Sequence, residues 1–169
     1  MAEYNDVYDR DRNLTGRVHR RGSPWNKDEY GLVVCVWVYD GKGKVLLTRR
    51  APQKSAPGTW ENSGGAAKAG EDSLTAIVRE LREETGIVAS QEEFELIASG
   101  RDKNCHYDFY CLRRDLPIEQ VILQPGETDD AKWATYAQIH EMIARGQICK
   151  VIAKQFVRQE ALLRARDTL

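Results

Sequence analysis

The chain has 169 residues, of which 30% are charged and 41% are hydrophobic. That length fits one domain and is sufficient to bury a substantial core. Lys and Arg number 25 against 26 Asp and Glu, so the formal net charge is −1. Because this balance gives no general attraction to anionic polymers or anionic lipid, we expect neither a nucleic-acid polymer nor a membrane as partner.

The N-terminal sequence, the apolar stretches and the cysteines indicate the cellular compartment. The N-terminal sequence MAEYNDVYDRDRN has no basic stretch leading into an apolar run, so we expect no signal peptide. No apolar stretch reaches the ~18 residues that a membrane span needs. The cysteines form no C-x-x-C pair, which argues against a zinc site or a redox motif. We therefore expect structural thiols and a cytoplasmic protein.

The first segment predicts a β-hairpin and a connector. Residues 7–22 (VYDRDRNLTGRVHRRG) are typical of a strand, a turn at Asn13–Gly16 and a return strand. Residues 23–29 are polar and contain a proline. We expect residues 1–29 to precede a core formed by residues 30–169, within a single domain that spans residues 1–169.

The core begins with two strands and a long loop. In Tyr30–Tyr39, apolar residues occupy both alternating faces, as in a strand covered on both sides. A turn at Asp40–Lys44 predicts a hairpin with a partner strand at residues 45–50. Residues 51–71 contain glycine turn signals and a short strand at Trp60–Asn62, which is typical of a functional loop.

Helices and strands alternate in the rest of the chain. Asp72–Thr85 has apolar residues at the 3.6-residue period, and Gly86 suits the left-handed residue after a helix. Further strands are predicted near Phe94–Ala98, His106–Leu112 and Ile118–Leu123, with helices in residues 131–146 and Ile148–Arg166. This order predicts an α/β fold, an α/β/α sandwich with a mixed β-sheet between helices and an N-terminal β-hairpin.

Three glutamates lie close together near the end of the first helix. Glu80 with Glu83 is an i,i+3 pair and Glu80 with Glu84 an i,i+4 pair. Each like-charge pair destabilises an isolated helix, and all three lie at the negative end of the helix dipole. Such a local cost is typical of functional sites. A hard cation such as Mg²⁺, which prefers oxygen ligands, would remove the conflict, so the cluster predicts a magnesium site.

The residues around this cluster resemble the Nudix box, the loop–helix–loop signature of Nudix hydrolases. That signature is glycine, five residues, glutamate, seven residues, then Arg-Glu-aliphatic-x-Glu-Glu-x-Gly-aliphatic. All of its fixed positions match between Gly65 and Ile87, including Glu71 and Arg79. The resemblance implies the Nudix fold and Mg²⁺-dependent hydrolysis of a nucleoside diphosphate linked to another moiety, with Mn²⁺ as a substitute.

The resemblance also implies roles for individual residues. Glu83 and Glu84 would be metal ligands, Glu80 would be a further ligand or would help to deprotonate the attacking water, and the Gly65 carbonyl would complete the metal sphere.

Two further box residues would support that set. Arg79 would orient the glutamates, and Glu71 would support the loop or bind a metal through water. Glu127 precedes Trp133 by six positions, where many Nudix enzymes have an extra ligand or general base; a solvated loop acid is the alternative.

Four side chains are candidates for substrate binding. Arg49 and Arg50 end a strand just before the loop and are candidates for phosphate contacts or for salt bridges. Trp60 and Tyr107 are candidates for stacking on a base, although packing in the core is the stronger interpretation.

The hairpin GRVHRRG and the segment RRAPQKSAPGTWENS are similar to the isopentenyl-diphosphate-isomerase-like branch of the superfamily. Isomerases of that branch use a catalytic cysteine in the loop that here spans Asn62–Ala67. No cysteine lies in or near this loop, and the box is intact, so we expect a hydrolase. An isomerase and a non-catalytic ligand sensor stay as alternatives, and the identity of the diphosphate and a homodimer are left open.

Overall fold

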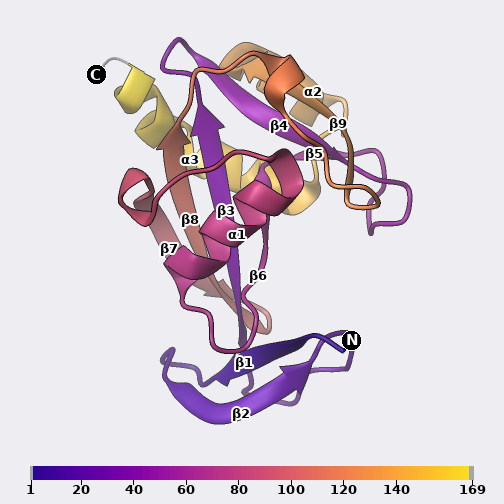
Figure 1. Cartoon of the computed structure of the whole chain (residues 1–169), viewed down its shortest axis with the longest axis vertical. Helices are drawn as coiled ribbons and strands as arrows, with labels where there is room; N and C mark the ends of the chain where they lie inside the picture. Colours follow the sequence, from indigo (N-terminus) through magenta and orange to yellow (C-terminus); the bar gives the residue numbers. More distant parts are fainter. Residues whose placement is uncertain (1, 168–169) are drawn as a thin grey trace.

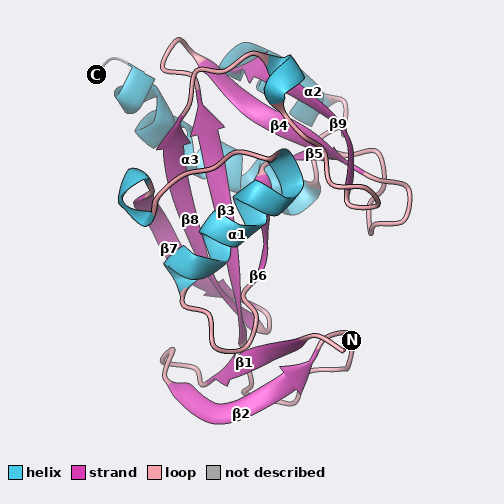
Figure 2. Cartoon of the chain, in the orientation of Figure 1, coloured by secondary structure: helices cyan, strands magenta, loops and turns pink. Residues whose placement is uncertain are grey.

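A mixed β-sheet lies between helices on its two faces in the computed structural model, which describes residues 2–167 (Figures 1 and 2). The helices are α1 (Ser73–Thr85), α2 (Tyr136–Ala144) and α3 (Lys150–Asp167). The strands are β1 (Tyr4–Tyr8), β2 (Leu14–Arg20), β3 (Gly31–Tyr39), β4 (Lys44–Arg50), β5 (Trp60–Glu61), β6 (Ser63–Ala66), β7 (Glu95–Asp102), β8 (Cys105–Arg113) and β9 (Thr128–Thr135). The predicted α/β/α architecture is confirmed.

Strand β3 is the centre of the larger sheet. It pairs in parallel with β8 along its whole length and antiparallel with β6. Its contact with β4 is limited to one register pair, Tyr39↔Val45, and β4 also pairs antiparallel with β9 from Lys44 to Arg50. Because β9 starts opposite Arg50, this pairing brings the segment that contains Glu127 to the start of the 51–59 loop.

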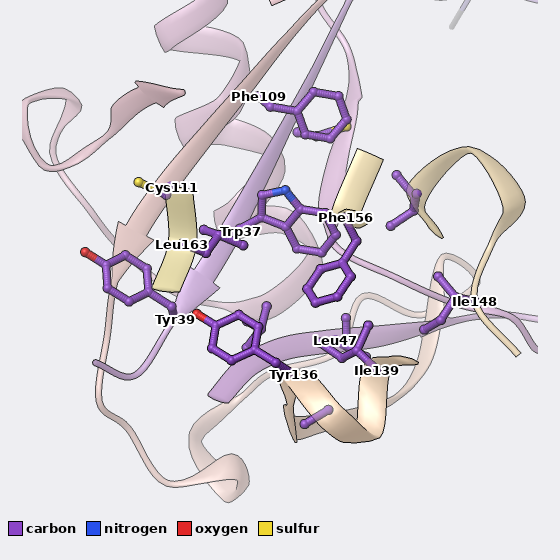
Figure 3. Packing of buried hydrophobic residues seen from close by; sticks show 14 of the residues in the cluster. Trp37, Tyr39, Leu47, Phe109, Cys111, Tyr136, Ile139, Ile148, Phe156 and Leu163 are labelled. Atoms are coloured by element: carbon purple, nitrogen blue, oxygen red, sulfur yellow. The ribbon is translucent and has the colours of Figure 1, made fainter. Parts of the chain in front are cut away.

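The two faces of β3 pack into two separate apolar clusters, which explains why its sequence is apolar throughout. Val34, Val36 and Val38 face α1, whereas Cys35, Trp37 and Tyr39 face α2 and α3. Figure 3 shows the second cluster, in which the Trp37 ring lies 5.6 Å from that of Phe156. The buried Trp37 Nε1 donates to Gln159 Oε1 at 2.6 Å, so its polar atom is satisfied.

Helix α1 has the predicted boundaries. The Asp72 side chain accepts a hydrogen bond from Thr75 N at the start, and Gly86 closes the end with φ of 72°. Ile77 and Leu81 are fully buried against the sheet. Burial of this face fixes the helix rotation, and therefore sets the direction of the three glutamates.

The N-terminal hairpin is present but its turn differs from the prediction. The turn spans residues 9–13, because Asp9 Oδ1 accepts hydrogen bonds from the backbone N of Asp11 and Asn13, both at 2.9 Å. Gly16, predicted to lie in the turn, lies within β2. The hairpin is tied to the core partly by Gly70 N, which donates to Asp6 Oδ2 at 2.7 Å.

Two other predictions need correction. The strand predicted at Ile118–Leu123 is wrong: these residues form a short 3₁₀ turn and a loop, in which Ile118 and Val121 pack on the α1 side of the core whereas Ile122 is exposed. The sequence predicts residues 131–135 only as the approach to a helix, but they belong to strand β9. Helix α2 starts at Tyr136 and ends at Ala144, before the predicted end at Gly146.

Within residues 2–167, none of the helices is long and apolar enough to cross a membrane.

Candidate active site

Arg79 is the centre of the acidic cluster on α1. Its Nε and Nη2 bind the two carboxylate oxygens of Glu71 at 2.7 and 2.8 Å. Its Nη1 donates to Glu80 Oε1 at 2.9 Å and to Glu83 Oε2 at 3.1 Å. The Glu71 contact raises the pKa of Arg79. Burial raises the pKa of Glu71, but the hydrogen bonds from Arg79 and from the backbone N of Lys68 together hold that pKa below its usual value. One guanidinium therefore offsets much of the repulsion predicted for this cluster.

Glu84 differs from the other glutamates of the helix because few neighbouring groups stabilise the negative charge of its carboxylate. Its residue is 8% exposed, and Gly64 N donates to its Oε2 at 3.1 Å. Within residues 2–167 it has no salt-bridge partner. Burial, together with the carboxylates of Glu80 and Glu61, raises the pKa of Glu84 to about 8. Burial also raises the pKa of Glu80.

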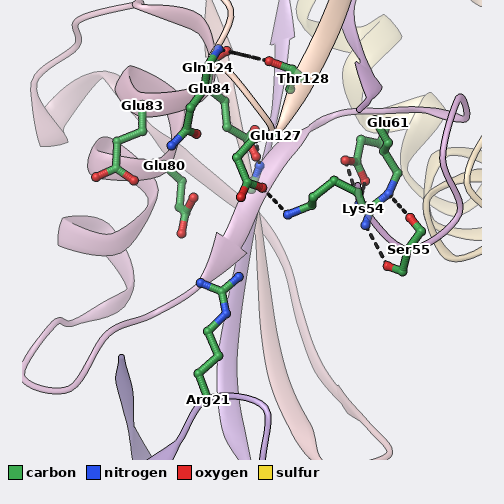
Figure 4. Close-up of polar contacts among 12 residues, drawn as sticks. Arg21, Lys54, Ser55, Glu61, Glu80, Glu83, Glu84, Gln124, Glu127 and Thr128 are labelled. Carbon is green, nitrogen blue, oxygen red and sulfur yellow. Dashed lines mark hydrogen bonds and ion pairs between the residues drawn. The ribbon is translucent and has the colours of Figure 1, made fainter. Parts of the chain in front are cut away.

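These carboxylates line one cavity of about 100 Å³, here called the carboxylate cavity. It is bordered by Glu80, Glu83 and Glu84 from α1, by Gly64 and Gly65 from β6, by Glu127 from the loop before β9, and by Arg21, Lys54, Lys68 and Arg79. Figure 4 shows that Glu127 lies beside Glu84 and that Arg21 extends from the N-terminal hairpin toward the same space. The fold thus brings together both acids and bases from distant parts of the sequence.

The cavity fits a divalent cation in its chemistry. The side chains in it that could bind a metal are carboxylates and the carboxamide of Gln124, and oxygen atoms are the ligands that Mg²⁺ prefers. A Cβ added at Gly65 would overlap the Glu80 carboxylate, so the glycine leaves the room that this carboxylate occupies beside the main chain. Within residues 2–167, however, no three Asp, Glu, His or Cys side chains form a ready-made metal site. Glu80 and Glu83 are turned toward Arg79.

Glu127 is held by a cation in this arrangement. Lys54 Nζ forms an ion pair with Glu127 Oε2, across 73 positions of sequence. The sequence gave no reason to assign Lys54 or Arg21 to the site, because each reaches the cavity only through tertiary contacts. Lys68, a basic residue within the box, has its Nζ 3.8 Å from Glu83 Oε1.

The predicted substrate-binding residues lie outside the carboxylate cavity. Arg49 Nε donates to Asp129 Oδ1 at 2.7 Å. The Arg50 Nη1 atom donates to both carboxylate oxygens of Glu61, at 2.7 and 2.6 Å. Trp60 is half-buried, with Lys132 Nζ 4.2 Å from its ring centroid. These contacts favour salt bridges for the two arginines.

The expectation that no cysteine lies near the Asn62–Ala67 loop is wrong in three dimensions. Cys35 lies opposite Gly64 in the β3–β6 ladder, and a Cβ added at Gly64 would lie 3.0 Å from Cys35 Sγ. The thiol is buried, and burial raises its pKa. The pairing of β3 with β6 brings Cys35 next to Gly64, although the two residues are far apart in the sequence.

Comparison with known proteins identifies the family. A family model described as NUDIX domain matches residues 29–154. The chain belongs to the Nudix family. The Nudix box predicted at Gly65–Ile87, which contains the glutamates of α1, lies entirely within this matched range.

Two similar proteins align with most of this Nudix chain. An uncharacterized Nudix hydrolase from Listeria monocytogenes is 29% identical over 149 residues, covering 87% of this chain and 88% of that protein. The crystal structure of DR0079 from Deinococcus radiodurans shares the fold with a TM-score of 0.78, at 24% identity, over 92% of this chain and 98% of that chain.

The likeness to isomerases is partial. An isopentenyl-diphosphate Delta-isomerase from Shigella flexneri is 42% identical over 64 residues, which are 37% of this chain and 35% of the isomerase. The resemblance predicted from the hairpin and the loop is therefore a likeness over part of each chain.

Proposed function

We propose that this Nudix protein is a Mg²⁺-dependent pyrophosphohydrolase acting on a nucleoside diphosphate linked to a further group. Water attacks one phosphorus, a new P–O bond forms, and the bridging P–O bond breaks, leaving two phosphomonoesters. The observation that carries the proposal is the carboxylate cavity, where the three glutamates of α1 and Glu127 meet the cationic side chains Arg21, Lys54 and Lys68. Carboxylates suit a metal and cations suit phosphate oxygens.

Glu80, Glu83, Glu84 and the Gly65 carbonyl would hold the metal. Mg²⁺ or Mn²⁺ bound there would neutralise the diphosphate and acidify or orient the attacking water. Glu80 and Glu83 would have to turn away from Arg79 Nη1, which binds both of them. Arg79 would keep its paired bonds to Glu71, so the helix and the loop before it would stay joined.

The proton of the attacking water needs an acceptor within the cavity. Glu80 and Glu127 are the two candidates, and both line it. The Lys54 ammonium beside Glu127 would orient that carboxylate or, on substrate binding, exchange it for a phosphate oxygen. Arg50 and Glu61 would support the loop from which Lys54 extends, because Arg50 Nη2 also donates to Ser55 Oγ at 2.9 Å.

A panel of diphosphates tests this function. Nucleoside diphosphates, dinucleoside polyphosphates, nucleotide sugars, ADP-ribose and a prenyl diphosphate are incubated with the protein, and released phosphate or phosphomonoester is measured. We expect turnover with Mg²⁺ or Mn²⁺, little with Ca²⁺, and none in EDTA. Glu83→Gln should lower kcat by about 100-fold or more, which is about 2.7 kcal/mol of barrier. The control Glu141→Gln, on the exposed surface of α2, should be fully active. Undiminished turnover in EDTA would refute the proposal.

A further inference from the structure

A second cavity, of about 340 Å³, adjoins the carboxylate cavity. Both are bordered by Lys54, Gly64 and Gly65, so they meet at β6 and the 51–59 loop. The walls of the second cavity include the apolar side chains Val33, Tyr107, Phe109, Val151 and Ile152. A group attached to a diphosphate in the first cavity would therefore enter a space whose size and apolar walls suit a small-molecule ligand.

Three polar side chains of this wall are poor partners for a ligand. Arg50 and Glu61 form an ion pair at 2.6 Å, and the other guanidinium nitrogens of Arg50 bind Ser55. The polar atoms of Asn62 have almost no accessible surface, so a molecule in the cavity does not reach them. Gln155, on α3, is a neutral polar side chain that also lines the cavity.

A series of hydrogen bonds through the core determines which end of the Gln155 carboxamide is left for a ligand. Trp37 Nε1 can only donate, and it binds Gln159 Oε1 at 2.6 Å. The amino group is then the remaining polar end of Gln159, and its Nε2 donates to Gln155 Oε1 at 3.2 Å. Because Gln159 holds Oε1 of Gln155, the Nε2 of Gln155 is the polar atom left for a further partner. The indole of Trp37 thus fixes the orientation of a carboxamide two hydrogen bonds away.

The amino group of Gln155 is accessible, although the residue is only 8% exposed. Within residues 2–167 its side chain is bonded through Oε1, and the buried side-chain nitrogen that lacks a partner is that of Asn62. The Nε2 atom of Gln155 therefore has accessible surface, and Gln155 lines the second cavity together with Ile152, three positions earlier on α3. A ligand in this cavity meets an N–H donor in a largely apolar wall.

We propose that Gln155 is a specificity-determining residue, which selects an attached group that carries a hydrogen-bond acceptor on an apolar body; this inference rests on the proposed function. A carbonyl oxygen or an unprotonated ring nitrogen would accept from Nε2. The donor is already held in place by Gln159, so binding costs little ordering of this side chain.

The same donor selects against a hydrocarbon as the attached group. A prenyl chain would fill the apolar walls but would cover the N–H of Gln155 without bonding to it. A site that offers a hydrogen bond rejects a ligand that lacks the partner. Gln155 therefore disfavours the prenyl group that the partial likeness to isomerases would suggest.

Isothermal titration calorimetry in Ca²⁺, which should support binding with little turnover, tests this inference. The probes with ring acceptors are ADP, GDP, CDP and UDP; the probes without them are benzyl diphosphate, dimethylallyl diphosphate and inorganic pyrophosphate. At least one nucleotide should bind the wild type about 10-fold or more tightly than every acceptor-free probe. Gln155→Met and the shorter Gln155→Leu should each weaken that nucleotide about 5-fold or more, and should change the affinity for benzyl diphosphate and pyrophosphate less than about 2-fold. The matched control Gln120→Met, an exposed site, should bind every probe like the wild type.

The outcomes separate this inference from the function on which it rests. Nucleotide affinities within about 2-fold of the wild type in the Gln155 variants overturn it. Equal weakening of benzyl diphosphate also overturns it, because the loss would then come from packing against a ring. Either result overturns the inference alone if the wild type still hydrolyses a diphosphate in Mg²⁺. If the wild type neither binds pyrophosphate nor hydrolyses any diphosphate, the proposed function fails and the role of Gln155 fails with it.

Discussion

Replacing the buried Glu84 with glutamine should stabilise the metal-free protein, increasingly so as the pH rises above about 4.5. Burial and two nearby carboxylates raise the pKa of Glu84 from 4.5 to about 8. In the folded state the protonated form is therefore favoured. Below pH 4.5 both the folded and the unfolded chain keep the proton, and the group costs nothing. As pH rises toward 8 the unfolded chain releases its proton first, so stability falls.

The pKa difference sets the size of the effect. Each pH unit between the two pKa values contributes about 1.4 kcal/mol, so the wild type loses on the order of 4 kcal/mol by pH 8. Glutamine is neutral, has nearly the same shape and can still accept the hydrogen bond from Gly64 N. Since 1 kcal/mol shifts Tm by roughly 2–4 °C in a chain of this size, Glu84→Gln should melt roughly 8–16 °C above the wild type at pH 8.

Thermal melting in EDTA at several pH values between 5 and 8 measures this difference. We expect the advantage of Glu84→Gln to shrink to about 2 °C at pH 5. The matched control is Glu83→Gln, because the Glu83 side chain is 34% exposed and accepts a hydrogen bond from Arg79. That variant should change Tm by no more than about 2 °C at any pH. A Glu84→Gln protein that melts with or below the wild type at pH 8 would refute this account of the site.

Two further predictions concern the reaction. With isopentenyl diphosphate and Mg²⁺ we expect no dimethylallyl product by chromatography; product that disappears in Cys35→Ala would instead identify an isomerase whose proton donor is the thiol beside Gly64. Lys54→Ala should raise KM for an accepted diphosphate by about 10-fold, because it removes a cation from the border of both cavities, whereas the exposed Lys154→Ala should leave KM unchanged. Equal KM values for the two lysine variants would exclude Lys54 from the phosphate site.

Local patterns in the sequence predicted the elements that local physics determines. Helix α1 follows from its apolar period and from Asp72 and Gly86 at its ends. The apolar run of β3 indicated a strand covered on both sides, which the two clusters confirm. The prediction at Ile118–Leu123 failed because alternation shows only that apolar side chains are buried, and not that a neighbouring strand is available.

The composition of the site depends on contacts that a local pattern does not contain. β9 pairs with β4 along its length, from Lys44↔Thr135 to Arg50↔Thr128, and this pairing brings Glu127 to Lys54. The pairing of β3 with β6 similarly puts Cys35 beside Gly64. Within residues 2–167 the two polar side-chain atoms of Asn62 have no hydrogen-bond partner, which the sequence does not show because it depends on the groups that surround them in the fold.

The placement of charge on α1 explains how the cluster is tolerated without a ligand. Arg79 binds Glu71, Glu80 and Glu83, so three of the four box glutamates share one cation. Glu84 lies on the buried side, and its raised pKa reflects the cost of ionising it there. A metal ion requires deprotonated carboxylates, so binding at this position would recover the free energy that burial costs. Because burial favours the protonated form of Glu84, a cation would have to displace that proton on binding, and a helix selected only for stability would have a neutral side chain at this position.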